Sequence, residues 1–110
     1  MWCIKDISDE VTTCECCGKS NLKLTVVLSN GEGEVFYGRD CAARKLLGNN
    51  KSGSVKLVER KAQAAVLARK WLSNGHSAEV VAKGIWNRFG FLTSAKGTAV
   101  DIDGVGIIAI

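Results

Sequence analysis

The sequence predicts a single α+β domain, and three observations support this prediction. A Cys-x-x-Cys-Gly motif begins at Cys14, and a further cysteine, Cys41, stands near the start of a short helical segment. Alternating apolar residues separated by turn signals indicate strands. Two longer segments repeat apolar residues with helical spacing. The expected order is an N-terminal zinc knuckle with a β-hairpin and a short helix, then two helices and a C-terminal β-hairpin.

The composition sets the size and setting of this domain. Hydrophobic residues make up 46 % of the 110 residues and charged residues 24 %, as in ordinary globular proteins. We expect one domain over residues 1–110, with parts at 1–48 and 54–110, because no proline-rich linker divides the chain. The first residues do not resemble a signal peptide, and no apolar run reaches the roughly 20 residues of a membrane span. These features favour a cytoplasmic protein that does not enter a membrane.

The first elements follow from a short alternation. Residues 1–13 are expected to be irregular or extended. Apolar residues at every second position over 22–28 predict a strand with one buried face, and Asn30-Gly31 is a hairpin signal before a returning strand over 34–37. A short helix over 41–47 should follow, with Asp40 as its N-cap and Gly48 as its C-cap.

Two longer helices and a hairpin fill the second part. Ser54 can cap a helix over 55–73, whose apolar side is interrupted by Lys61 and Arg69. Ser77 can cap another helix that ends near Phe89, and Gly84 should weaken it. Trp71 and Trp86 are expected to pack these helices together, although either could serve an interface. Residues 98–110 predict a hairpin that turns at Asp103-Gly104.

The cysteines point to a metal. Their number is odd, and three of the five lie within residues 14–17, which favours metal over disulfides in a reducing compartment. In a Cys-x-x-Cys-Gly turn the backbone amides point at the thiolates, and Gly18 permits the tight return. Cys14, Cys17 and Cys41 are therefore expected to bind one structural Zn²⁺ ion. Buried cysteines without metal and a redox pair are weaker interpretations, the latter because a strand, not a long helix, follows the motif.

The order of knuckle, hairpin and helix with a ligand in its first turn resembles the treble-clef zinc fold over about residues 11–47. The motifs Cys14-Glu15-Cys16-Cys17-Gly18-Lys19 and Tyr37-Gly38-Arg39-Asp40-Cys41-Ala42-Ala43 are also similar to those of small zinc proteins from phages and bacteria. This resemblance covers about a third of the chain. It implies a zinc module and a phage-type accessory role, and it brings no catalytic residues.

The fourth zinc ligand is left open. A treble clef usually places it three residues after the third, but that position is Arg44, which cannot bind zinc. Cys3 is the preferred candidate, because sites of four cysteines are common and the N-terminal segment can fold back. Asp40 comes next. Cys16, His76, a water molecule or no ligand are the other candidates.

One segment is strongly basic. Residues 39–70 hold nine Lys or Arg against two acids, a net charge of +7 within a chain whose total is +4. Such a segment favours an anionic partner, although many charged helix faces are simply solvated. The candidate contact residues are spread over the short helix and the first long one: Arg39, Arg44, Lys45, Lys56, Arg60 and Lys70.

These features predict a zinc-binding protein that is not an enzyme and whose basic helical segment binds nucleic acid or an acidic protein surface. One alternative is a phage-type interaction module that inhibits or redirects a host protein. A small zinc-dependent enzyme is the least favoured, because a catalytic zinc needs a nearby base and Glu15 is the only candidate.

Overall fold

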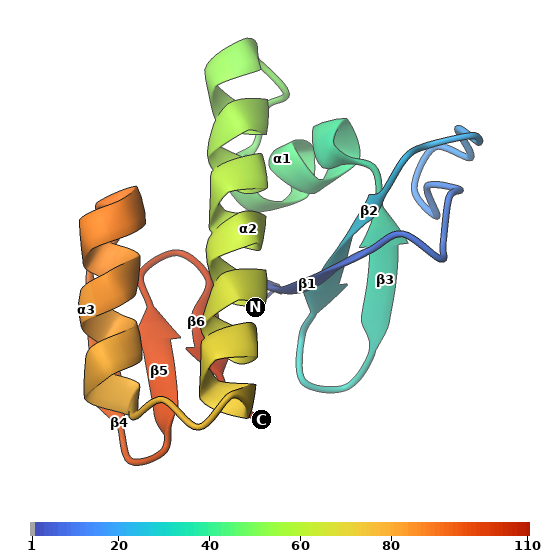
Figure 1. The fold of residues 1–110 in the computed structure, drawn as a ribbon. Coiled ribbons are helices and arrows are strands. Elements are labelled where there is room, and N and C mark those ends of the chain that lie inside the picture. The colour runs from blue at the N-terminus through green and yellow to red at the C-terminus, as the bar shows by residue number, and fades with distance from the viewer. Residues whose placement is uncertain (1) are drawn as a thin grey trace.

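The computed structural model describes residues 2–110, which form three helices and two small antiparallel sheets (Figure 1). The mixed α+β class is therefore confirmed. No helix within these residues is both long and apolar enough to cross a membrane. The elements follow in the order β1 (Cys3–Ser8), β2 (Thr25–Ser29), β3 (Glu34–Tyr37), α1 (Arg39–Leu47), α2 (Ser52–Ser73), α3 (Ala78–Phe89), β4 (Thr93–Lys96), β5 (Ala99–Ile102) and β6 (Gly106–Ile108).

The N-terminal sheet has the strand order β1-β2-β3, so β2 is its central strand. Four consecutive residues of β2, Thr25 to Leu28, are buried. The alternation predicted over 22–28 is therefore wrong, because a central strand covered on both faces does not need a polar side. The strand begins at Thr25, and Leu24 is left 38 % exposed. The Thr25 hydroxyl is satisfied by donating to the Val11 carbonyl oxygen at 3.0 Å.

Helix α2 lies between the N-terminal sheet on one side and α3 with the C-terminal sheet on the other (Figure 1). Its buried stripe is made mostly of alanine, which allows close approach of its neighbours. The buried apolar residues of both parts of the chain form one hydrophobic cluster that includes Leu28, Val58, Ile85 and Ile102. Helix α2 therefore packs against both parts of the hydrophobic core.

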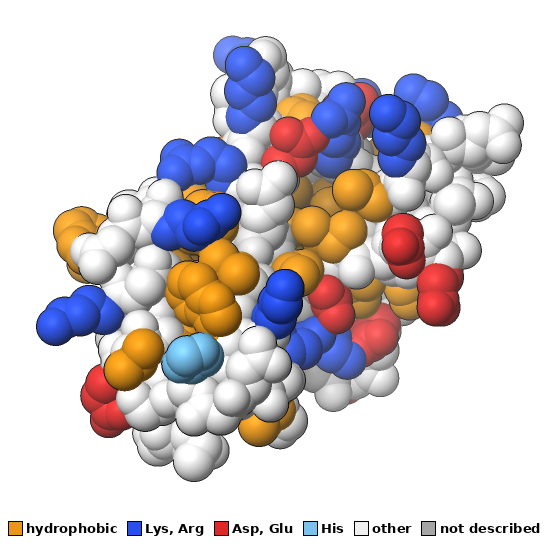
Figure 2. Space-filling view, viewed as in Figure 1, with side chains coloured by type: hydrophobic (Ala, Val, Ile, Leu, Met, Phe, Trp, Pro, Cys, Tyr) orange, Lys and Arg blue, Asp and Glu red, His pale blue; other side chains and the backbone are white. Residues whose placement is uncertain are grey.

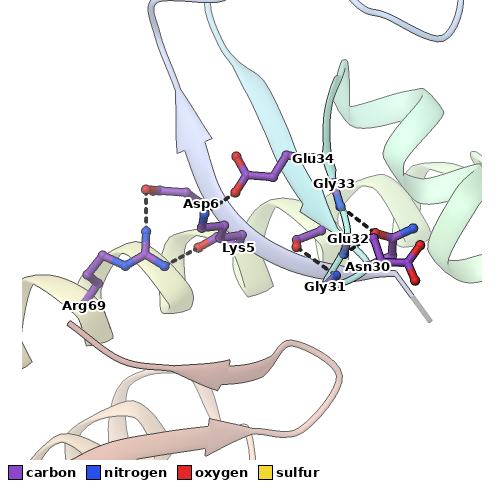
Figure 3. A network of polar contacts seen from close by, with 9 residues as sticks. Lys5, Asp6, Asn30, Gly31, Glu32, Gly33, Glu34 and Arg69 are labelled. Carbon is purple, nitrogen blue, oxygen red and sulfur yellow. Dashed lines mark hydrogen bonds and ion pairs between the residues drawn. The ribbon is translucent and has the colours of Figure 1, made fainter.

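The two cations that interrupt the apolar side of α2 tie it to the sheets. Arg69 donates to the Asp6 carboxylate at 2.6 Å and to the Lys5 carbonyl oxygen at 3.1 Å (Figure 3). Lys5 in turn forms an ion pair with Glu34 of β3. Lys61 lies against the turn at Gly104, where any side chain would collide with its ammonium group. Arg69 is therefore held at the edge of the core by polar contacts, and Lys61 is half-buried beside the Gly104 turn.

The helix ends only partly follow the sequence signals. Gly38, not Asp40, is the N-cap of α1, so Asp40 lies in the first turn instead. Helix α2 starts at Ser52, and the Ser54 hydroxyl donates to Asn49 Oδ1 at 2.7 Å rather than capping the helix. The Ser77 cap of α3 is confirmed, since its hydroxyl accepts from the Val80 amide at 3.3 Å. Gly48 also ends α1 as predicted.

Of the two tryptophans predicted to pack α2 against α3, only Trp71 does so. The Trp71 ring lies directly against Gly84, so the glycine makes room for an aromatic side chain in the helix interface. Trp86 is 50 % exposed, and its predicted role in this contact is wrong. It follows Ile85, which is fully buried, and adjacent residues of a helix point about 100° apart.

The C-terminal sheet has the order β4-β5-β6. The hairpin that turns at Asp103-Gly104 is confirmed, with Ile102 paired to Gly106. Strand β4 was not predicted, because in the C-terminal part only residues 98–110 were assigned to strands. Most of its side chains are exposed, so it shows no alternation of apolar and polar residues. It pairs with β5 across a tight turn between Lys96 and Ala99.

Candidate metal centre

Three cysteines from two segments meet beside the N-terminal sheet. The Sγ atoms of Cys14, Cys17 and Cys41 all lie within 4.8 Å of one another. A tetrahedral zinc ion with Zn–S bonds of ~2.3 Å places its ligand sulfurs ~3.8 Å apart, so this arrangement fits a metal ion. Cys14 and Cys41 are buried, with exposures of 1 % and 6 %, whereas Cys17 is exposed. The centre is thus buried on one side and open to solvent on the other.

Backbone hydrogen bonds shape the knuckle and fasten it to β3. The Cys14 amide donates to the Lys19 carbonyl oxygen, and the Gly18 amide donates to the Cys14 carbonyl oxygen, both at 2.9 Å. Gly18 has a φ of +77°, which suits glycine in this tight return. The Glu15 amide donates to the Phe36 carbonyl oxygen, and the Glu15 carboxylate accepts from the Phe36 amide, both at 2.9 Å. The knuckle therefore continues the hydrogen bonding of the sheet.

Gly38 joins β3 to α1 at the point where the cluster forms. A side chain at this position would lie 3.3 Å from Leu22 Cδ1 and 3.7 Å from Cys14 Cβ, so the backbone passes close to the first cysteine. The helix that begins at Arg39 then carries Cys41 in its first turn. Cys41 and the two alanines after it are buried, which holds the helix against the sheet. The position of the Cys41 thiol therefore depends on the packing of α1 against the sheet as well as on the turn at Gly38.

The cluster already favours a thiolate without any metal. Burial acts to raise the pKa of the Cys14 thiol, but hydrogen bonds from the amides of Cys17, Gly38 and Cys16 and from the Cys41 thiol outweigh it. The pKa of Cys14 is lowered from 9.0 to about 7. Burial, followed by the neighbouring cysteine side chains, raises the pKa of Cys41 well above its usual range. Amides directed at sulfur are what a metal-bound thiolate requires.

Tyr37 is a member of the site that sequence reasoning missed. Burial first, and then the negative charges of Cys16, Cys14 and Cys41, raise the pKa of its hydroxyl. The phenol thus lies within electrostatic range of the cluster and stays protonated. Its neighbour Gly38 was quoted for the motif, but its close approach to Cys14 was not foreseen. The only sequence signal for either residue is its place within the motif Tyr37-Gly38-Arg39-Asp40-Cys41.

The structure does not bring the preferred fourth ligand, Cys3, to the cluster. Cys3 opens β1 opposite Ser29, and its thiol lies against Gly106 of the C-terminal sheet. The knuckle follows the other end of β1, about 17 Å away by the length of the strand. This prediction is therefore corrected: β1 is a paired strand, so it cannot fold back. A different cysteine, Cys16, lies nearby and interacts with the Cys41 thiol.

The two other predicted alternatives also lie outside the group of three thiols. Asp40 is exposed on the first turn of α1, and its carboxylate is not part of the group that the structure brings together in residues 2–110. His76 is exposed in the connection between α2 and α3. Its amide donates to the Trp71 carbonyl oxygen at 3.1 Å, which places the histidine on the other part of the molecule. Cys16 is therefore the nearest remaining protein ligand.

The six predicted partner-binding cations do not form one free patch. Arg39 forms an ion pair with Glu59, and Lys45 lies 5.4 Å from the centre of the Trp2 ring. Arg60 donates to the Phe89 carbonyl oxygen at 2.8 Å and lies over the Phe91 ring. Of the six, Arg44, Lys56 and Lys70 are exposed and form no ion pair, side-chain hydrogen bond or aromatic contact within residues 2–110. Half of the set is therefore engaged inside the molecule.

No model of a known protein family, no curated protein and no solved structure matches this chain. The resemblance to small zinc proteins of phages and bacteria therefore stays a prediction. What the structure supports directly is the cysteine cluster: three thiols close enough to bind a metal ion, with a fourth cysteine nearby. The cysteine cluster and the exposed surface around it are the features that point to a function.

Proposed function

We propose that this protein is a non-enzymatic binding protein whose N-terminal part is held together by one structural zinc ion. The thiolates of Cys14, Cys17 and Cys41 would bind the ion, and Cys16 would complete a site of four cysteines. The observation that carries this proposal is the meeting of three thiols within 4.8 Å, with backbone amides directed at one of them. Few apolar contacts hold the exposed knuckle against α1. Zinc would link the two segments instead.

A structural role for the metal fits the surroundings better than a catalytic one. Sites rich in thiolates are mostly structural, whereas catalytic zinc sites keep an open position beside a base. Glu15, the carboxylate considered as a base, is occupied as the acceptor of the Phe36 amide. The order of knuckle, hairpin and helix also supports a treble-clef-like arrangement, in which the metal would set the angle between β3 and α1.

The fourth ligand can be tested by cobalt substitution. With Cys16 bound, the cobalt-loaded protein should show the absorption of a tetrahedral site with four sulfurs, and Cys16→Ser should weaken metal affinity about 10- to 100-fold. Cys3→Ser is the matched control and should leave the spectrum and the affinity unchanged. A spectrum of three sulfurs that does not change in Cys16→Ser would contradict the assignment and leave the fourth position to water or another group.

The binding function that we propose is directed at an acidic protein surface, because the chain keeps exposed cations that no acid of residues 2–110 neutralises. Nucleic acid is the second candidate. It is favoured by Arg44 and Lys56, both exposed near the α1–α2 connection. The aromatic stacking surface of many single-strand binders has no counterpart there.

The nucleic-acid candidate predicts a steep loss of affinity with salt. Binding of a short DNA duplex or an RNA strand would release counterions, so raising salt from 50 to 200 mM should reduce affinity by about 10-fold or more. Arg44→Glu with Lys56→Glu should abolish this binding, and Lys83→Glu with Lys96→Glu serves as a control of equal charge change. If neither DNA nor RNA binds at low salt, nucleic acid is excluded and the acidic protein surface remains.

A further inference from the structure

A groove runs along α2 on the face shown in Figure 2. One hollow of about 550 Å³ lies between residues 19–24 and α2, and a second of about 350 Å³ lies between β1, α2 and the end of α3. Ile7 and Gln63 line both hollows, so the two are neighbours along α2. We refer to them together as the α2 groove. Figure 2 shows hydrophobic side chains between α2 and the N-terminal sheet, with both basic and acidic side chains around them.

The floor of the α2 groove is apolar and partly uncovered. It is lined by Ile7, Leu22, Leu24, Val66, Leu67 and Phe89. Leu24 and Val66 are among the large hydrophobic side chains that the fold leaves in water, with exposures of 38 % and 36 %. Covering them with an apolar partner would be favourable at about 25 cal/mol per Å².

The rim of the α2 groove is positively charged. Lys19 and Lys23 line one end, and Lys70 and Arg88 line the other. All four are exposed, and none forms an ion pair or side-chain hydrogen bond within residues 2–110. The one acid that lines the groove, Glu59, is neutralised by Arg39. Four cations that form no ion pair within residues 2–110 therefore line this apolar floor.

We propose that the α2 groove binds an acidic amphipathic segment of another protein. Carboxylates of that segment would meet the cations of the rim, and its apolar side would cover Leu24 and Val66. Nucleic acid fits less well, because phosphates need no aliphatic floor and the only aromatic side chain that lines the groove is Phe89. The groove extends about 16 Å along α2, from Glu59 to Lys70. A partner helix of about three turns would have this length.

This inference rests on the proposed binding function and names its partner. The test is a displayed library of random peptides, selected on the full zinc-loaded chain. Selected peptides should combine Asp or Glu with Leu, Ile or Phe. Their affinity, measured by fluorescence anisotropy, should fall about 10-fold or more in Lys70→Glu with Arg88→Glu. The control Lys83→Glu with Lys96→Glu changes charge equally at exposed residues outside the groove and should leave affinity unchanged.

Four results would overturn the proposal. The first is selection of peptides that lack acidic residues, and the second is affinity that the variants at Lys70 and Arg88 do not change. The third is failure to select any peptide while the protein retains its zinc. The fourth is a concentration-dependent dimer lost in the same variants, which would assign the groove to a second copy of this chain. Each leaves the metal assignment standing, because zinc content and cobalt spectra measure that separately.

Discussion

Cys14→Ser is expected to abolish zinc binding and to release residues 9–24 from the sheet. Cys14 is the most buried of the three clustered cysteines and the one whose thiolate the backbone amides favour. Its serine variant leaves Cys17 and Cys41 of the clustered thiols, with Cys16 as the only further sulfur proposed, and in such sites binding energy is folding energy. We expect zinc affinity to fall at least 100-fold. Metal analysis and hydrogen exchange at the Glu15 and Phe36 amides measure the two effects.

The variant should not unfold the whole chain. Most of the buried cluster lies in β1, β2, the helices and the C-terminal sheet, while the knuckle contributes little apolar area. The amides of α2 and α3 should therefore keep their protection in Cys14→Ser. Cys3→Ser, which changes a half-buried thiol outside the cluster, should retain zinc and the knuckle's protection. A Cys14→Ser protein that holds one zinc ion with wild-type affinity would contradict the assignment of this ligand.

Gly84→Ala is expected to destabilise the protein, against the preference of helices for alanine. Helix propensity alone predicts a gain of about 1 kcal/mol from this change. A Cβ atom at residue 84 would lie 2.6 Å from Cζ3 and 3.0 Å from Cη2 of Trp71, closer than carbon atoms approach in proteins. Overpacking of this kind costs about 1 to 3 kcal/mol, so it should outweigh the propensity gain. Urea unfolding of the zinc-loaded protein measures the net free energy.

A double-mutant cycle separates the two effects. Trp71→Leu removes the ring, so in that background Gly84→Ala should stabilise α3 by about 1 kcal/mol. The sign of the alanine effect should thus reverse between the two backgrounds. A stabilising Gly84→Ala in the wild-type background would show that α2 and α3 do not pack through this contact, and the arrangement of the two parts of the core would need revision.

Several local sequence signals predicted the structure correctly, although the N-caps expected at Asp40 and Ser54 were wrong. The Cys-x-x-Cys-Gly turn, the Ser77 cap and the turn at Asp103-Gly104 all depend on neighbouring residues, and each is found where predicted. Cys41 was also correctly grouped with the knuckle, because a hairpin returns the chain to its start.

Long-range packing decided what the sequence did not reveal. Pairing of β1 with β2 moved Cys3 away from the cluster, and a local reading of residues 1–13 cannot predict that pairing. Gly84 looked like a weak point of a helix, and only the Trp71 ring explains it. The basic segment looked like a free surface, yet Arg39 and Arg60 are held by Glu59 and Phe89. Charge counts do not show which cations already have partners.

Some of the predicted contact cations already interact with other residues of the protein, and this changes where a partner would bind. The predicted surface was a helix face with Lys56, Arg60 and Lys70, but Arg60 is engaged with the segment that follows α3. The cations that line the apolar floor and form no ion pair within residues 2–110 come from three separate segments. Two of them, Lys19 and Lys23, lie outside the basic segment over residues 39–70. The Cys14 amide donates to the Lys19 carbonyl oxygen, so if the knuckle holds the proposed ion, its loss should also disturb one end of the α2 groove.

The most direct test of this account is the metal content of the protein purified without a histidine tag or added metal. Elemental analysis by mass spectrometry, with the protein concentration measured independently, should give one zinc ion per chain. A chelator should remove it, and stability should fall when it is removed. Protein that contains no zinc, binds none on addition and is equally stable with and without chelator would contradict the central claim that Cys14, Cys17 and Cys41 form a structural metal site.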